Sequence, residues 1–400
     1  MKHTIAKKDA SDSIGNPAFN AIPSTGWRDE KAHYRCFFLI PFMATLLTAS
    51  RLGALTINAI FDNTITSDPQ AAAIEATINS AIAVYEADFS DPITVSFNFI
   101  KTNNGLASSS TYITTVSYSD YLTALKSHAI SADDAIALAH LPSGPNNPVN
   151  GNMQITLNLP LARALGFSAY PPSGQPDSTI SLNITNMNIT ASNPDASKYS
   201  LFSAVSHEMD EGLAFGGGLN GLINGAASPT DDSVEPEDLF RYAQNGARSW
   251  TTDINAVSYF SLDGTTDLAR FNQDDGGEKA DFEDWYSPGG QTPQVQDAFG
   301  TPGAFPVLGV ELRMFDAIGF TYSSSYKPSP VWVNFDYSGS PQNGTYQNPF
   351  KTLAQGISAV ASGRTIAINA TVQASRSSET MTISKPMTII SVNGPSIMGQ

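Results

Sequence analysis

The segment His207-Glu-Met-Asp-Glu211 holds the side chains of this sequence that are best suited to chemistry on a metal ion. Residues four apart share one face of a helix, so His207 and Glu211 can direct an imidazole nitrogen and a carboxylate oxygen at one ion. Both atoms are common zinc ligands. Glu208 lies about 100° around the helix from His207, where it can act as a general base on a water molecule at the ion. The alternative places both glutamates on a solvated face and His207 as a partly buried polar residue.

A catalytic zinc site needs a third protein ligand from outside this segment. The candidates are Asn220, Asp238 and Asp284, and we favour Asp238 within Glu-Asp-Leu-Phe-Arg-Tyr. Tyr242 or Tyr259 could donate a hydrogen bond to an oxyanion during hydrolysis. The alternative for both tyrosines is ordinary packing in the core.

The chemistry requires a helix across this segment, and the surrounding sequence predicts one over residues 198–213. Asp195 is a suitable N-cap, and the glycine run 216–218 is expected to end the helix. A helical apolar stripe runs along it, formed by Leu201, Phe202, Val205, Met209 and Leu213.

Elsewhere the pattern alternates irregularly between strands and helices, which indicates an α+β fold. His128 and His140 fall at the ends of two predicted helices, where a helix-capping role is favoured over metal binding. We expect strands over residues 55–61, 92–100, 155–159 and 180–185, and helices over 71–85, 119–125, 131–139 and 310–318.

Charge and cysteine content narrow the class of protein. The formal net charge is −16 and we find no basic patch, so a nucleic-acid partner is not expected. The single cysteine, Cys36, excludes an intramolecular disulfide. It lies in an apolar run over residues 36–49 that follows Arg35, and small residues come after it, as in a secretory signal peptide. We therefore expect a secreted, extracellular protein without a membrane partner after cleavage near Arg51; an uncleaved N-terminal anchor is the alternative.

The chain divides into four parts by composition. We expect an N-terminal extension with the signal peptide over 1–54, a main domain over 55–322, a linker over 323–330 and a β-rich segment over 331–400. In the last part, short β-rich pieces at 365–368, 381–383 and 387–390 repeat coarsely.

The main domain resembles a family of secreted bacterial zinc metalloproteases of the zincin type, some of which carry H-E-x-x-E. The resemblance rests on His207-Glu-Met-Asp-Glu-Gly-Leu, together with matching stretches that begin at Asn58, Glu86, Asp238, Tyr259, Phe271, Asp284, Val295 and Glu311. It implies a zincin-like α+β domain with His207 and Glu211 as ligands and Glu208 as base. Gly212 and Ala214 depart from the family pattern, and a mid-helix glycine costs about 0.5–1 kcal/mol relative to alanine.

Residues 331–400 resemble the opening turns of a right-handed parallel β-helix of the pectin-lyase-like kind. The matching stretches are Val331-Trp-Val-Asn-Phe-Asp, Gly344-Thr-Tyr-Gln-Asn-Pro-Phe-Lys-Thr-Leu and the Thr-Ile repeats. The resemblance implies contact with a cell surface or polysaccharide. It implies no lyase activity, because the segment has no cluster of aspartates and basic residues.

The favoured function is a secreted zinc endopeptidase that acts on protein or peptide substrates. The alternative is a non-catalytic surface or adhesion protein with a degenerate protease domain. A third hypothesis, a structural Ca²⁺ ion in a carbohydrate-binding protein, rests on the Asp/Asn/Gly-rich residues 253–284, which ordinary turns would equally explain.

Overall fold

A computed structural model gives the fold for residues 5–9, 54–192, 194–219, 234–273, 282–289, 291–323, 331–340, 342, 344, 349–360, 364–370, 375–385, 387–392 and 395–399. The predicted signal peptide and most of the linker lie outside these residues. The architecture is α+β, as expected. No helix in this described part combines the length and apolar composition needed to cross a membrane.

The helices and strands have the following bounds. The helices are α1 Asn63–Thr66, α2 Ala71–Asp88, α3 Tyr118–His128, α4 Ala132–His140, α5 Leu159–Ala164, α6 Leu201–Leu213, α8 Val310–Ile318 and α9 Leu353–Ala359, with 3-10 turns η1 Ile184–Asn186 and η3 Pro236–Phe240. The strands are β1 Ile5–Asp9, β2 Thr56–Phe61, β3 Thr94–Lys101, β4 Ala107–Ser117, β5 Gln154–Asn158, β6 Ser178–Leu182, β7 Met187–Asn188, β8 Tyr199–Ser200, β9 Arg241–Ala243, β10 Ser258–Phe260, β11 Ala269–Arg270, β12 Val331–Val333, β13 Thr365–Asn369, β14 Ser375–Ser377, β15 Thr388–Val392 and β16 Ser396–Met398.

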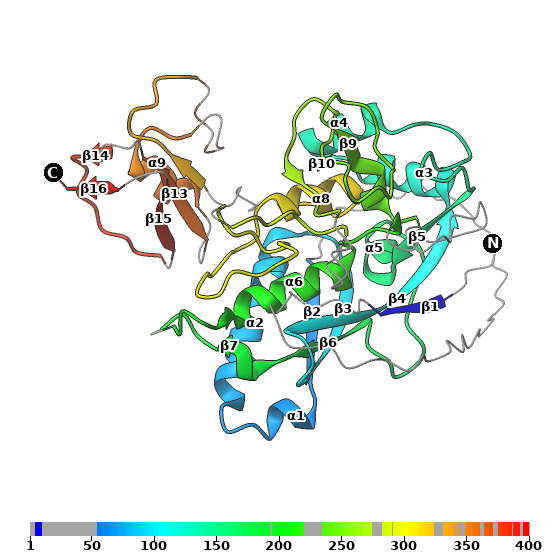
Figure 1. The fold of residues 1–400 in the computed structure, drawn as a ribbon, viewed down its shortest axis with the longest axis horizontal. Coiled ribbons are helices and arrows are strands. Elements are labelled where there is room, and N and C mark those ends of the chain that lie inside the picture. Colours follow the sequence, from blue (N-terminus) through cyan, green and yellow to red (C-terminus); the bar gives the residue numbers. More distant parts are fainter. Residues whose placement is uncertain are drawn as a thin grey trace.

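A mixed sheet forms the centre of the larger body (Figure 1). Its strand order is β1-β4-β6-β3-β2, and β5 pairs with β4. Strands β2, β3 and β6 run parallel, whereas β4 runs antiparallel to β1, β5 and β6. Helix α6 packs against β4, β6 and α2, so the His207–Glu211 segment lies directly on the sheet.

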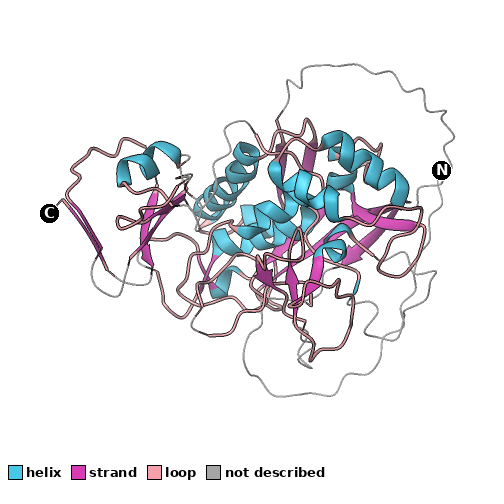
Figure 2. Ribbon diagram, turned by 90° about the horizontal axis from the view of Figure 1, so that it is seen from above, coloured by secondary structure: helices cyan, strands magenta, loops and turns pink. Residues whose placement is uncertain are grey.

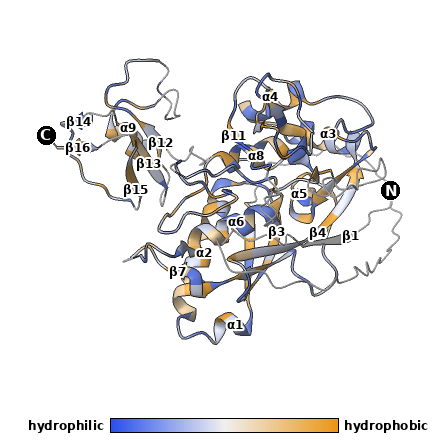
Figure 3. Ribbon diagram, in the orientation of Figure 1, coloured by the Kyte–Doolittle hydropathy of each residue, from blue (hydrophilic) through white to orange (hydrophobic). Residues whose placement is uncertain are grey.

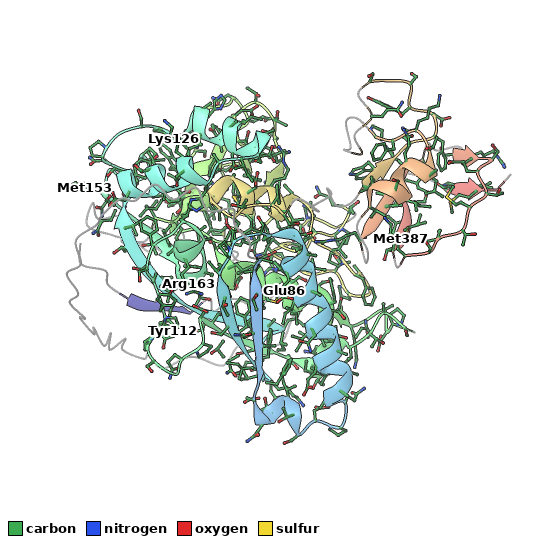
Figure 4. All side chains as sticks on the ribbon, turned by 180° about the vertical axis from the view of Figure 1, so that it is seen from behind. Glu86, Tyr112, Lys126, Met153, Arg163 and Met387 are labelled. Atoms are coloured by element: carbon green, nitrogen blue, oxygen red, sulfur yellow. The ribbon has the colours of Figure 1, made fainter. Side chains whose placement is uncertain are left out.

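Helix α2 is fixed to the sheet by polar as well as apolar contacts. Its isoleucines Ile74, Ile78 and Ile82 are buried in the main core. Glu86, labelled in Figure 4, accepts a 2.8 Å hydrogen bond from the backbone N–H of Ile57 in β2. Hydrophobic and hydrophilic residues alternate along the helices of this body (Figure 3), and α6 and α8 bury acidic as well as apolar side chains.

The longest strand, β4, is absent from the sequence-based prediction. Its residues are largely serine and threonine, and the ones that point inward include Ser109, Thr111 and Thr114. Because polar side chains stand on its buried face, the apolar alternation that marks a half-buried strand is missing. The strand nevertheless supplies a side chain to the site described below.

Helix α6 begins later than predicted. Its N-cap is Ser200, whose hydroxyl accepts a hydrogen bond from the N–H of Ser203 at 3.1 Å. Asp195 instead caps the preceding turn, where it accepts from the N–H of Ser197. Tyr199 and Ser200 form the short strand β8, which pairs with β7 and prevents an earlier helix start.

Gly212 has a packing role inside α6. A Cβ atom there would lie 2.5 Å from Cε1 of Phe97 in β3 and 3.4 Å from the side chain of Ser178 in β6. The glycine therefore lets the helix approach the sheet closely, which accounts for its place in the middle of a helix.

The C-terminal residues form a small separate group of strands with their own core (Figure 2). Strands β12, β13 and β15 pair in parallel, and β14 pairs in parallel with β16. Residues 381–383, expected as a β piece, belong to no strand. Arg364, next to β13, forms an ion pair with Asp88 at the end of α2 and so connects this group to the larger body.

Candidate metal centre

Three side chains converge at one point beside α6: His207, Glu211 and Asp284. Each offers a ligand atom, and the three atoms lie within 4.8 Å of one another. Nε2 of His207 is 3.4 Å from Oε1 of Glu211 and 3.6 Å from Oδ2 of Asp284. The helix face expected for His207 and Glu211 is therefore the face that the structure shows.

These separations match a shared ion better than direct hydrogen bonds. A good N–H···O bond is about 2.7–3.2 Å long, so contacts of 3.4 and 3.6 Å are too long for one. Ligands of a tetrahedral ion with bonds of about 2.0–2.2 Å lie about 3.3–3.6 Å apart. The two separations from Nε2 of His207 therefore suit a shared ion, and the donor set is one imidazole and two carboxylates.

The ring of His207 is oriented by a backbone carbonyl. Its Nδ1 lies 2.9 Å from the carbonyl oxygen of Val295, and a carbonyl can only accept, so Nδ1 carries the proton. Nε2 is then the ring nitrogen that faces Glu211 and Asp284. Metal-binding histidines are commonly oriented in this way by a second hydrogen bond.

Glu211 is held at both its side chain and its main chain. The hydroxyl of Ser109 in β4 donates to Oε2 of Glu211 at 2.6 Å. The amide of Asn158, at the end of β5, donates to the carbonyl oxygen of Glu211 at 2.6 Å. The sheet thus fixes both the glutamate and the last turn of the helix that carries it.

Asp284 lies on a segment that pairs with residues 271–273. Phe271 and Trp285 form an antiparallel bridge, and the N–H of Asn272 donates to the carbonyl of Asp284 at 2.6 Å. The ring of Trp285 packs against Phe215, Phe260 and Phe271 with ring centroids 5.1–5.9 Å apart. Aromatic packing therefore anchors the residue next to the third ligand.

Glu311 in α8 connects the supports of two ligands. Its Oε1 accepts from the indole N–H of Trp285 at 3.2 Å and from the N–H of Gln296 at 3.1 Å. Gln296 follows Val295, whose carbonyl orients His207. One buried carboxylate thus holds both the residue after Asp284 and the residue after Val295, which orients His207. The sequence motif alone does not reveal this role.

A further carboxylate of the helix, Asp210, is held by α2 and is not among the proposed ligands. Tyr85 of α2 donates to Oδ1 of Asp210 at 2.7 Å, and its hydroxyl lies 2.8 Å from the carbonyl of Ser206. Burial, with nearby Glu311 as a further cause, raises the pKa of Asp210 well above its usual range. Asp210 therefore joins α6 to α2 on the inner side of the helix.

Glu208, the predicted base, lies on α6 between His207 and Asp210 and is only 1% exposed. It follows His207 directly, so its side chain leaves the helix about 100° around from the imidazole. Its burial removes it from the solvated face that the alternative interpretation of the motif requires.

Asp238, the favoured third ligand, lies at a different place. Its Oδ2 accepts from the N–H of Gly218 at 2.8 Å and from the N–H of Glu235 at 2.9 Å. The cluster of possible ligands in the described residues contains Asp284 and does not contain Asp238. Asp238 holds the glycine turn after α6 against η3, and Asn220 lies outside the described residues.

The neighbourhood of Asp238 is a buried charged cluster around Arg241. The guanidinium stacks over Phe271 with its carbon 3.9 Å from the ring centroid, and Gln273 accepts a 3.1 Å hydrogen bond from it. Burial lowers the pKa of Arg241, while Glu283, Asp238 and Glu237 act in the opposite direction. Arg241 thus contacts both paired segments near Asp284, through Phe271 and Gln273 on one and Phe282 on the other.

The two tyrosine candidates lie on neighbouring strands, where Tyr242 of β9 pairs with Tyr259 of β10. Arg248 stacks over the ring of Tyr242 with its guanidinium carbon 4.2 Å from the centroid. The ring also fills the space beside Gly264. Tyr242 therefore packs in the protein, as the alternative proposed.

Two histidines and two aspartates outside the cluster have local roles. Nδ1 of His128 and of His140 lies 2.9 and 2.8 Å from the carbonyl four residues earlier, which places both at helix ends as expected. Asp253 and Asp263 accept from backbone N–H groups two residues ahead, as in Asx turns. These contacts favour the turn interpretation over a Ca²⁺ site at those two positions.

Two surface grooves of about 460 Å³ each are lined by residues that include Asp68 and Lys101 in one, and Arg163 and Tyr170 in the other. Neither lining includes a member of the metal cluster.

The comparisons with family models, curated proteins and solved structures find no match to this chain. Its function must therefore be argued from the geometry of the cluster.

Proposed function

We propose that the protein is a secreted zinc-dependent endopeptidase in which His207, Glu211 and Asp284 hold the metal ion. The observation that carries the proposal is that Nε2 of His207 lies 3.4 Å from a carboxylate oxygen of Glu211 and 3.6 Å from a carboxylate oxygen of Asp284. Three protein ligands on a zinc ion leave one position for water or substrate, as catalytic sites require.

The donor set favours zinc over calcium. Calcium takes six to eight oxygen ligands at about 2.3–2.6 Å, and an imidazole nitrogen is not among its usual ligands. Zinc accepts nitrogen and oxygen donors in a four-coordinate arrangement. Once bound, it would supply a Lewis acid that polarises a carbonyl group and makes water more acidic.

The chain's own residues supply the remaining functions. Ser109 and the carbonyl of Val295 hold two ligands in fixed orientations. Glu208 is the proposed general base, because it follows the ligand His207 on a buried helix. The low exposure of the ligands and of Glu208 excludes bulk water and strengthens electrostatic interactions within the site.

The proposal extends to the architecture and the partners. The main domain would be zincin-like, since a helix with both ligands lies on a mixed sheet and a loop further along the chain adds the third ligand. The parallel strands after Val331 would begin a β-helix that contacts a cell surface or polysaccharide. Protein or peptide chains outside the cell would be the substrates.

A second candidate function is a non-catalytic extracellular surface or adhesion protein with a degenerate protease domain. The observation in its favour is the small exposed fraction of the site: the side chains of His207, Asp284 and Glu211 are 1%, 4% and 11% exposed. On this view the buried side chains would serve stability, and the C-terminal strands would carry the interaction.

Metal content tests the proposal directly. We expect one zinc ion per chain in wild type and at least a hundredfold weaker zinc binding in His207→Ala and Asp284→Asn, by the order of magnitude expected for a lost ligand. Asp238→Asn is the matched control, because it also replaces a buried aspartate but lies outside the cluster. Zinc loss in Asp238→Asn with retention in Asp284→Asn would reverse the assignment of the third ligand.

Activity separates the two functions. The endopeptidase predicts zinc-dependent cleavage of an unfolded protein such as fluorescein-labelled casein, abolished by a chelator and restored by zinc. A chain that holds no stoichiometric zinc, cleaves nothing under these conditions and folds unchanged as His207→Ala would be the non-catalytic candidate.

A further inference from the structure

A buried side chain, that of Arg364, anchors the C-terminal strand group (β12–β16) on the larger body. The carbonyl oxygen of Arg364 accepts a 3.0 Å hydrogen bond from the N–H of Thr388, so its backbone belongs to the parallel sheet of this group. Its guanidinium forms the ion pair with Asp88 and donates to the carbonyl oxygen of Val84 at 3.3 Å. The residue is therefore built into both parts of the chain.

The burial of this ion pair makes the two parts depend on each other. The side chains of Arg364 and Asp88 are only 4% and 3% exposed. Burial lowers the pKa of Arg364 to about 10, while nearby Tyr85 acts to raise it. If either charged group lost its partner and stayed in place, it would be a buried, uncompensated charge, which is costly. The strand group is therefore either docked on α2 with the pair intact or separated from it with both charges in water.

The turn of α2 that Arg364 contacts also holds the segment that leads toward the strand group. The N–H of Ser323 donates to the carbonyl oxygen of Asp88 at 2.7 Å, and its hydroxyl donates to the carbonyl oxygen of Ala87 at 2.6 Å. Phe89 and Tyr322 form an antiparallel bridge, and their rings stack with centroids 6.0 Å apart. The last turn of α2 is thus a junction between the two parts.

The same turn is joined to the helix of the metal centre through Tyr85. This tyrosine is fully buried, and its hydroxyl donates to Oδ1 of Asp210 at 2.7 Å and lies 2.8 Å from the carbonyl oxygen of Ser206. In α6, Ser206 directly precedes His207, and Asp210 directly precedes Glu211. The contact of Tyr85 therefore falls on the turn of α6 that carries both helical ligands.

We propose that the C-terminal strand group is a docked module whose ion pair with α2 holds α6 in place, so that undocking loosens His207 and Glu211. A polysaccharide that binds the undocked arrangement more tightly than the docked one would then act on the metal centre from a distance. That consequence rests on the proposed function. The coupling between Arg364 and α6 requires neither bound zinc nor peptidase activity.

Hydrogen–deuterium exchange of the full-length chain, read by mass spectrometry on peptides from α6 and α4, tests the coupling. Arg364→Met removes the charge but keeps an extended side chain, whereas Arg364→Lys keeps the charge. Lys351→Met is the matched control, because Lys351 is an exposed cation of the same strand group. Helix α4 packs against α8 and is the internal reference for the stability of the whole body.

We expect the α6 amides to exchange roughly tenfold faster in Arg364→Met than in the parent chain, because the unpaired Asp88 favours opening of the docked turn. The α4 amides should exchange at the parent rate. Arg364→Lys and Lys351→Met should both resemble the parent in α6. Unchanged α6 exchange in Arg364→Met, or an equal acceleration of α6 and α4, would overturn the proposal.

Tyr85→Phe tests whether the effect passes through α2. Phenylalanine keeps the ring but cannot donate to Asp210, so α6 should again exchange faster. Because both substitutions break one connection, the double variant with Arg364→Met should exchange little faster than the faster of the two single variants. Multiplied effects in the double variant would show that the two contacts act independently, and the coupling would be rejected.

Zinc content of the same chains separates this inference from the proposed function. Faster α6 exchange in Arg364→Met, together with no stoichiometric zinc in the parent, would retain the coupling and reject the zinc endopeptidase. One zinc ion per chain together with unchanged α6 exchange would retain the metal centre and reject the coupling.

Discussion

Ser109 and Glu211 are joined by a 2.6 Å hydrogen bond that connects the strand β4 to the helix α6. The bond uses Oε2 of Glu211, while Oε1 is the oxygen that lies 3.4 Å from the imidazole of His207. The two oxygens therefore have separate tasks, one held by the sheet and one directed at the proposed ion. Supporting contacts of this kind tune how well a ligand is preorganised.

Replacing Ser109 by alanine should weaken zinc binding without unfolding the protein. We expect roughly a 10-fold loss in affinity, at the lower end of the range for outer-shell changes at metal sites. Competition with a chromogenic chelator measures it. Ser108→Ala is the control, since the neighbouring residue points to the opposite face of β4. An unchanged affinity in Ser109→Ala would show that the hydrogen bond has no part in metal binding.

Gly212→Ala should destabilise the protein although alanine favours helix. The helix-propensity gain of about 1 kcal/mol competes with an atom placed 2.5 Å from the ring of Phe97. Overpacking of this kind costs about 1–3 kcal/mol, so we expect a net loss of roughly 1 kcal/mol and a melting temperature lower by a few degrees. Gly289→Ala, where no atom lies within 4 Å, is the control.

A partial rescue would identify the clash as the cause. Phe97→Leu shortens the side chain that an alanine at position 212 would meet, so the double variant should lose less stability than the sum of the two single variants. Additive losses would point instead to a cost inside the helix itself.

The elements predicted from the sequence are those whose apolar residues follow a regular period. Helix α2 and helix α8 are examples, and Gly319 ends α8 as expected with φ 130°. Strand β4 was missed because Ser109, Thr111 and Thr114 replace apolar residues on its buried face. The start of α6 was misplaced because pairing of β8 with β7 overrides the capping preference of Asp195.

The metal centre divides in the same way between local and non-local information. The pair His207 and Glu211 follows from helix geometry alone, because the two residues are one turn apart. Asp284 lies more than seventy positions further along the chain, and aromatic packing of Trp285 brings it to the helix. No spacing rule relates such positions, so the sequence could offer Asp284 only as one candidate beside Asp238.

The buried carboxyl group of Asp316 should make the free energy of unfolding of the protein fall as pH rises from about 4 to about 8. Burial raises its pKa from 3.8 to about 8, with the charge of Asp134 as the next cause and Asp133 adding to it, while Arg313 acts to lower it. Between those values the folded state holds a proton that the unfolded chain has lost, so the folded state is favoured at low pH and loses this contribution as pH increases. The size is on the order of a few kcal/mol.

Asp316→Asn removes that titration. Its free energy of unfolding, from urea denaturation at several pH values, should therefore decline less between pH 5 and 8 than in wild type. Other buried acids, such as Asp297 with a pKa raised to about 7 by burial, titrate in both proteins and cancel in the difference. The exposed Asp267→Asn is the control and should follow wild type; parallel curves for Asp316→Asn and wild type would contradict the buried-proton interpretation.

Glu208→Gln should separate metal binding from catalysis. Glutamine keeps the size of the side chain but cannot accept a proton, so the turnover of labelled casein should fall by roughly 10²–10⁴-fold, the usual contribution of a general base. Zinc content should remain at one ion per chain, because Glu208 is not a member of the ligand cluster. Glu75→Gln, on the outer part of α2, is the matched control and should retain full activity. Full turnover in Glu208→Gln would assign the proton transfer to another group and leave the buried glutamate with a structural role.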